Sequence, residues 1–192
     1  MEILIFAETD DKGNLKKDAY EIASYASEIA SENGGSVNAL CFNASNAESL
    51  SDYGVNKIIN SKNEQLKNFD PSNYSKCINE VFNNEKCNLL VLSSSSNSKH
   101  IGGILSVLID ASYVTNVISK LTNGEKMTVV RNTFTNKAFE TVEIIKNKTI
   151  LAISKNSFGL KENPVKSEFV ETNFNIPESK NKVKSIERAK NT

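Results

Sequence analysis

The sequence contains 192 residues, a length that suits one domain followed by a tail. Lysine plus arginine and aspartate plus glutamate both number 23, and this zero net charge speaks against a nucleic-acid-binding surface, which normally carries a basic excess. No apolar run approaches the roughly 20 residues of a membrane-spanning helix, so we expect no membrane insertion.

The first residues and the cysteines both favour a cytoplasmic protein. The opening Met1-Glu2-Ile3-Leu4 lacks the basic segment of a signal peptide. The cysteines, at positions 41, 77 and 87, are odd in number, lie far apart and form no C-x-x-C pair. We expect all three to be small apolar side chains in a reducing cytosol.

Strand-like and helix-like segments alternate over the first 118 residues. Short apolar runs predict strands at residues 3–7, 37–42, 57–60, 89–92 and 114–118. Helical spacing of apolar residues predicts helices at about residues 15–33, 71–82 and 99–109, and Ser45 with Glu48 has the spacing of a capping box that would begin a further short helix. This alternation indicates an α/β fold with a mostly parallel sheet flanked by helices in three layers.

The pattern changes after Asn123-Gly124. Three strand-like runs follow, at residues 127–130, 138–145 and 149–153, and Asn147-Lys148 between the last two is a candidate hairpin turn. We expect these runs to form an antiparallel extension of the sheet. The chain turns polar afterwards, and we divide it into a domain at residues 1–172 and a polar linker or tail at 173–192.

Ligands of parallel sheets bind beyond the carboxyl ends of the strands, which places candidate sites in the loops at residues 8–14, 43–45 and 93–99. In the last of these, Ser94, Ser95 and Ser96 precede a helix near Lys99, an arrangement whose donors suit a phosphate. The loop lacks the glycines of a P-loop or a G-x-G-x-x-G turn. We therefore favour a polar connection without a ligand and expect weak or no nucleotide binding.

Other polar residues are weaker candidates. Glu8, Asp10 and Asp11 have the oxygen ligands that a hard cation prefers, but a solvated loop is the favoured interpretation. His100, the single histidine, is expected to be structural, because nothing in the sequence pattern places a nucleophile against its side chain. Arg131 ends a strand-like run and is expected at the surface or at an interface, where a carboxylate is a suitable partner. We identify no catalytic residue and no metal site.

Four stretches together resemble the alpha subunit of electron transfer flavoproteins. The opening strand Ile3–Glu8 with the following Gly13-Asn14-Leu15 turn is similar to the start of that family. Residues 52–59 resemble its glycine-containing signature before the third strand, residues 129–139 resemble its arginine-led hairpin, and residues 150–159 resemble its strand followed by Ser-Phe. Asn136 replaces the usual hairpin glycine, and Lys155 stands where many members have arginine.

The resemblance implies a fold similar to the adenine-nucleotide hydrolases and a role as the N-terminal domain of that subunit. It implies a heterodimer with a beta subunit, carrying electrons from acyl-CoA and related dehydrogenases to a membrane quinone reductase. FAD is then the cofactor of the complete protein, bound by a C-terminal domain whose motifs this sequence lacks, and AMP is expected in the beta subunit. The chain itself is then an electron-transfer subunit rather than an enzyme.

Two other functions remain as alternatives. A stand-alone nucleotide-binding module of the universal-stress-protein type would need a glycine-rich loop after the fourth strand, where residues 93–98 have none. An ATP pyrophosphatase would need a Ser-Gly-Gly-x-Asp-Ser loop near the first strand, where Ala7-Glu8-Thr9-Asp10 stands instead.

Overall fold

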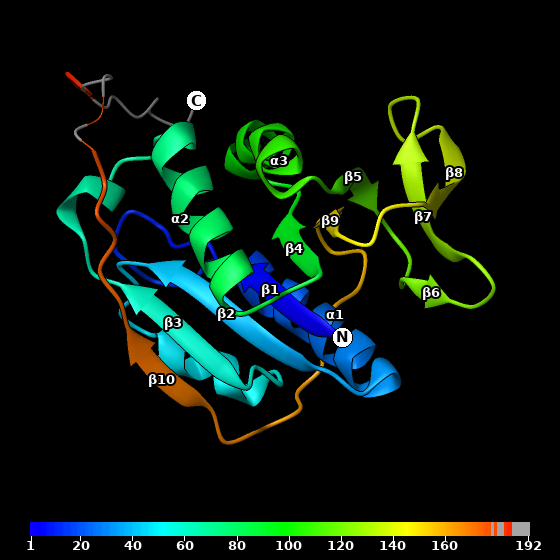
Figure 1. Cartoon of the computed structure of the whole chain (residues 1–192), viewed down its shortest axis with the longest axis horizontal. Helices are drawn as coiled ribbons and strands as arrows, with labels where there is room; N and C mark the ends of the chain where they lie inside the picture. Colours follow the sequence, from blue (N-terminus) through cyan, green and yellow to red (C-terminus); the bar gives the residue numbers. More distant parts are fainter. Residues whose placement is uncertain (178, 180–182, 186–192) are drawn as a thin grey trace, which may run out of the picture.

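The strands form one ten-stranded sheet in the computed structural model, which describes residues 1–177, 179 and 183–185 (Figure 1). The strands are β1 (Glu2–Phe6), β2 (Ser36–Phe42), β3 (Lys57–Ser61), β4 (Leu89–Ser93), β5 (Ser112–Val117), β6 (Thr122–Asn123), β7 (Met127–Thr133), β8 (Ala138–Ile144), β9 (Thr149–Ile153) and β10 (Glu168–Glu171). The helices are α1 (Lys17–Asn33), α2 (Pro71–Asn84) and α3 (Ser96–Ile109), with short 3₁₀ helices η1 (Ala47–Asp52) and η2 (Glu64–Leu66).

Most of the sheet is parallel. Its order is β10-β3-β2-β1-β4-β9-β5-β7-β6, with β8 paired to β7 beside this path. The first seven strands of that order pair in parallel, whereas β7 runs antiparallel to β5, β6 and β8. The prediction of a mostly parallel sheet with an antiparallel extension is confirmed.

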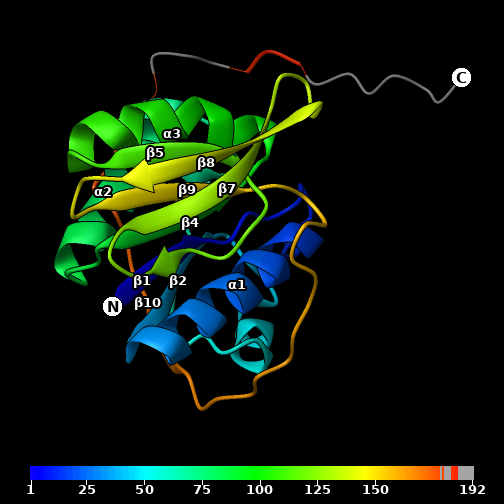
Figure 2. The ribbon, with the colours of Figure 1, turned by 90° about the vertical axis from the view of Figure 1, so that its right-hand side faces the viewer.

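Helices cover both faces, which gives the three predicted layers (Figure 2). Side chains alternate between the faces along each strand. Ile3 and Ile5 of β1 pack in the cluster that includes α1, and Leu4 and Phe6 pack in the cluster that includes α2 and α3. Since β1 and β4 are buried on both sides, they read in the sequence as continuous apolar runs without polar alternation.

The prediction that residues 149–153 belong to the antiparallel extension is wrong. β9 lies between β4 and β5 and is parallel to both, with Ile150 opposite Leu90 on one side and Tyr113 on the other. Every residue of β9 is buried, as expected for an interior strand. Asn147-Lys148 is not a hairpin turn either, because β8 pairs with β7 and the chain leaves it for the middle of the sheet.

Two predicted helix starts are also wrong. Ser45 does not cap a helix: η1 begins at Ala47, and the Ser45 hydroxyl donates instead to the Gly13 carbonyl at 3.0 Å. α3 begins at Ser96 rather than near Lys99, because the Ser95 hydroxyl accepts a hydrogen bond from the Ser98 amide at 3.0 Å and so caps the helix. The predicted start of α2 is confirmed, with Asp70 accepting from two amides of the first turn.

Neither β10 nor the segment that leads to it was predictable from the sequence pattern. Residues 154–167, called here the strap, leave β9 in the middle of the sheet, cross α1, and bring β10 against β3 at the far edge. Beyond β10, Phe174 and Ile176 are buried in the core on the side of α2. The division at residue 172 stays a prediction, and most of the predicted tail lies at residues 178, 180–182 and 186–192, outside the described residues.

Candidate functional site

The strand order reverses between β1 and β4. The chain adds β2 and β3 on one side of β1 and then places β4 on its other side. The chain connections after β1 and β4 run to opposite sides of the sheet, which leaves a crevice between them, the usual ligand position in open α/β sheets. The loops that line this crevice, at residues 8–14 and 93–99, are two of those predicted from the sequence.

Glu8 fills the bottom of this crevice. Its carboxylate is 6% exposed and accepts hydrogen bonds at both oxygens. Lys16 Nζ lies 2.7 Å from Oε2, and Ser98 Oγ donates to Oε1 at 3.0 Å. Ser95 also donates to Oε1, and Ser93 Oγ lies at 3.4 Å from the same atom. A buried negative charge thus faces one ammonium group and three hydroxyl groups.

These partners keep Glu8 ionised. Burial alone would raise the pKa of the carboxyl, because it disfavours the charged form. The hydrogen bond and charge of Lys16, with the hydroxyls of Ser95 and Ser98, outweigh burial and hold the pKa below its ordinary value. The cluster of Glu8, Lys16 and the three serines is therefore a charged, closed site at neutral pH.

The three serines singled out from sequence have different roles. Ser95 caps α3 and faces Glu8, but Ser94 donates to the Ala152 carbonyl at 3.2 Å and Ser96 is exposed in the first turn of α3. Ser93, Ser98 and Lys16 were missed. The position of Ser98 was predictable, since the residue three positions after a capping serine often lies beside the cap.

The solvated-loop interpretation of the acidic residues holds for Asp10 and is wrong for Glu8. Asp10 is exposed and accepts from the amides of Lys12 and Asn14 at 2.8 and 2.9 Å, which makes it a turn residue. Glu8 belongs instead to the buried cluster. In the part of the chain that the structure describes, no three histidine, cysteine or acidic residues are placed to hold a metal ion.

A cleft of about 800 Å³ opens above Glu8, between the loop after β1 and the start of α2. Its walls include Phe42, Phe69 and Tyr74, and its rim carries Lys12 and Lys67. The hydroxyl of Tyr74 donates to the Leu66 carbonyl at 2.8 Å, and burial raises its pKa to about 12, so it stays neutral. The cleft is therefore lined by aromatic side chains together with charged ones of both signs, which include Asp10 and Asp11.

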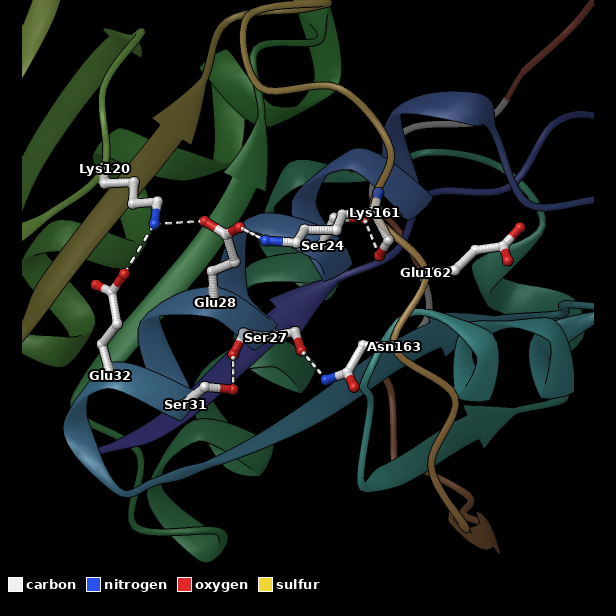
Figure 3. A pocket seen from close by; sticks show the side chains of 9 residues that line it. All are labelled: Ser24, Ser27, Glu28, Ser31, Glu32, Lys120, Lys161, Glu162 and Asn163. Carbon is white, nitrogen blue, oxygen red and sulfur yellow. Dashed lines mark hydrogen bonds and ion pairs between the residues drawn. The ribbon is translucent and has the colours of Figure 1, made fainter.

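A second pocket, of about 340 Å³, lies where the strap crosses α1 (Figure 3). Glu28 pairs with Lys120 at 2.6 Å and with Lys161. The side-chain amide of Asn163 donates to Ser27 Oγ at 2.9 Å. The Lys161 amide donates to Ser24 Oγ at 3.0 Å. The contacts of Lys161 and Asn163 hold the strap against α1, whereas Lys120 binds α1 from outside the strap.

The remaining candidates are structural. His100 and Lys99 are exposed on α3, and Arg131 forms the predicted ion pair, with Nε 2.8 Å from Glu140 Oε2. All three cysteines are buried and free, as expected. Lys155, at the position where arginine is common, lies 3.4 Å from Asp18. None of the helices among the described residues combines the length and apolarity that crossing a membrane requires.

The comparison with protein families agrees with the resemblance seen in the sequence. The family model described as "Electron transfer flavoprotein domain" matches residues 3–189, which is nearly the whole chain. The search of curated proteins finds no significant match.

Proposed function

The chain belongs to the electron transfer flavoprotein domain family, and we propose that residues 1–172 are the supporting and subunit-association domain of its alpha subunit. In this proposal the complete heterodimer carries electrons from acyl-CoA and related dehydrogenases to a membrane quinone reductase in the cytoplasmic compartment. FAD belongs to the complete protein and AMP to the beta subunit. The chain works as part of an electron carrier and not as an enzyme.

The observation that carries the choice of the alpha subunit is the position of Glu8. In the proposed heterodimer the beta subunit binds AMP, and a phosphate at this crevice would need the donors that Glu8 already uses. Lys16 and Ser98 are bonded to the carboxylate at 2.7 and 3.0 Å. A buried carboxylate repels a second anion, so this chain suits the subunit that does not hold the nucleotide. The same feature disfavours the stress-protein alternative.

The hairpin of β7 and β8 supports a role in association. Phe134 and Phe139 are 76% and 74% exposed, and aromatic side chains are common among the anchors of protein interfaces. β8 pairs with β7 alone among the described strands, which leaves its outer edge open. An open edge flanked by exposed aromatic rings is suited to a partner chain.

The hairpin loop also has an unusual backbone. Phe134, Thr135 and Asn136 have φ angles of 48°, 54° and 61°, in the left-handed region. Asparagine tolerates this region, which explains how Asn136 replaces the family's glycine, but Phe134 and Thr135 adopt it at a cost. Such strained residues cluster at binding sites, which agrees with a role of this loop in association.

The proposal is tested with the purified chain, FAD and a purified electron transfer flavoprotein beta subunit. We expect the chain with added FAD to show no bound-flavin absorbance after gel filtration, and to associate with the beta subunit in light scattering or calorimetry. Stoichiometric bound flavin would contradict the supporting role. Absence of association would contradict the subunit assignment, and micromolar binding of AMP or ATP would favour the nucleotide-binding alternative.

A further inference from the structure

The cluster of Glu8, Lys16 and the three serines has the donors of an anion-binding site, and the carboxylate of Glu8 occupies the position of the anion. We propose that Glu8 is an internal ligand that closes an oxyanion site at the bottom of the cleft, and that removing its carboxylate lets a free phosphate bind among Lys16, Ser95 and Ser98. This closed site is a property of the chain alone, so it stands or falls separately from the association with a beta subunit.

The hydrogen-bond directions support an oxyanion at this position. Ser95 Oγ already accepts from the Ser98 amide, so the Ser95 hydroxyl hydrogen is free to be donated to Glu8. Ser98 Oγ and Ser93 Oγ point to the same carboxylate oxygen, and Lys16 approaches the other. Three hydroxyl donors and one ammonium group that converge on two oxygens are the donors that a phosphate uses in proteins.

The cavities show a path to this position. A small cavity of about 30 Å³ lies directly against Glu8 and is lined by Phe6, Ala7, Thr9, Phe42, Tyr74 and Asn97. Four of these residues, Thr9, Phe42, Tyr74 and Asn97, also line the cleft of about 800 Å³. The volume vacated by a shortened Glu8 side chain would therefore join a space that continues into the cleft.

The covalent attachment of Glu8 explains why the site is closed in the native chain. A tethered ligand competes at a high effective concentration, so a free anion must displace it to bind. Displacement would also leave the Glu8 carboxylate beside the incoming anion in a buried position, which is strongly unfavourable. The native protein is therefore expected not to bind phosphate here, although the donors are suitable.

The test measures how inorganic phosphate changes the thermal unfolding midpoint of the full chain at constant ionic strength, with chloride as the compensating salt. The Glu8→Ala variant is expected to show a midpoint about 4 °C higher at a tenfold excess of phosphate over its dissociation constant than without phosphate. The native chain and Glu8→Gln, whose amide still fills the position, are expected to show only the small general effect of phosphate.

A double variant separates the site from general stabilisation. Adding Lys16→Met to Glu8→Ala removes the ammonium donor and is expected to abolish the specific rise. Equal rises in all four proteins, or no rise in Glu8→Ala, would overturn the proposal. If Glu8→Ala is unfolded without added anion, its refolded fraction is followed against phosphate, and a fraction that does not increase overturns the proposal as well.

Discussion

Glu8 makes the stability of the chain depend on pH in a defined direction. Because its pKa is lower in the folded state, its contribution is fully present above the ordinary glutamate pKa of 4.5 and is lost as the pH falls through the folded value. We expect the free energy of unfolding to decrease more steeply below about pH 4.5 in the native chain than in Glu8→Gln. Urea unfolding from about pH 3 to 7 measures both slopes.

The same variant has a second expected effect at neutral pH. Glu8→Gln keeps the shape of the side chain but removes the charge that Lys16 and the serines bind, and we expect a loss of about 1–3 kcal/mol. Asp10→Asn is the control, since Asp10 lies in the same loop but is exposed. If the free energy of unfolding of the native chain and of Glu8→Gln changed with pH in parallel, Glu8 would not be the group that causes the loss of stability at low pH.

At the residue level, the sequence located the site but not its partners. The loops after the first and fourth strands were chosen because parallel strands end at one edge, and both contain residues of the cluster. The burial of Glu8 was not predictable, because an acidic residue before Asp10 and Asp11 reads as part of a solvated turn. Only the strand order places Ser93 and Ser98 over it.

One buried carboxylate attaches the first part of the strap to α1. Glu21 is 5% exposed and accepts hydrogen bonds from three backbone amides of the strap, those of Asn156 at 2.9 Å, Phe158 at 2.8 Å and Gly159 at 3.0 Å. An ionised carboxylate accepts hydrogen bonds at both oxygens and adds no donor, so it can satisfy all three amides. Glu21 thus fixes the path of the chain from β9 towards β10.

We expect Glu21→Ala to lower the free energy of unfolding by about 2–3 kcal/mol, because three backbone amides of the strap lose a charged, buried acceptor. The strap should also open locally, so trypsin should cut faster after the exposed Lys161 and Lys166. Urea unfolding and mass spectrometry of the first tryptic fragments measure the two effects.

Glu32→Ala is the matched control on the same helix. Glu32 is 53% exposed and pairs only with Lys120 among its recorded ion pairs, so its loss is expected to change stability by less than about 0.5 kcal/mol. First cuts distributed over the whole chain in Glu21→Ala would indicate global unfolding and would contradict a local attachment role.

At the level of elements, the strands were predictable and their order was only partly so. The apolar run at residues 149–153 has the same character as β1 and β4, and this character was a sign of an interior parallel strand. Its position after the β7–β8 hairpin favoured an antiparallel partner instead. β10 could not be identified from periodicity, because it is a short strand at the edge of the sheet. Three of its four residues are exposed, so it shows no alternation of apolar and polar residues.

For the whole molecule, the two ends of the sheet differ. At one end, β10 covers the edge of β3 and the strap fastens it across α1. At the other end, the β7–β8 hairpin extends beyond the three-layer core, as Figure 1 shows. β10 is the last strand at its end and pairs only with β3 among the described strands, so both ends of the sheet have an open edge. The exposed rings of Phe134 and Phe139 therefore favour the hairpin end as the place where a second chain binds.

The last prediction tests this end directly. Replacing Phe134 and Phe139 by serine and threonine removes two exposed rings, so we expect the free energy of unfolding to change by about 0.5 kcal/mol or less. If the rings are anchors, association with the beta subunit should weaken tenfold or more, which corresponds to about 1.4 kcal/mol. Val107→Ser on α3 is the control, because Val107 is 80% exposed and lies outside the hairpin. Calorimetric titration gives the dissociation constants of the native chain and of both variants. If the double variant bound the beta subunit as tightly as the native chain, or if Val107→Ser weakened binding equally, the partner would bind another surface.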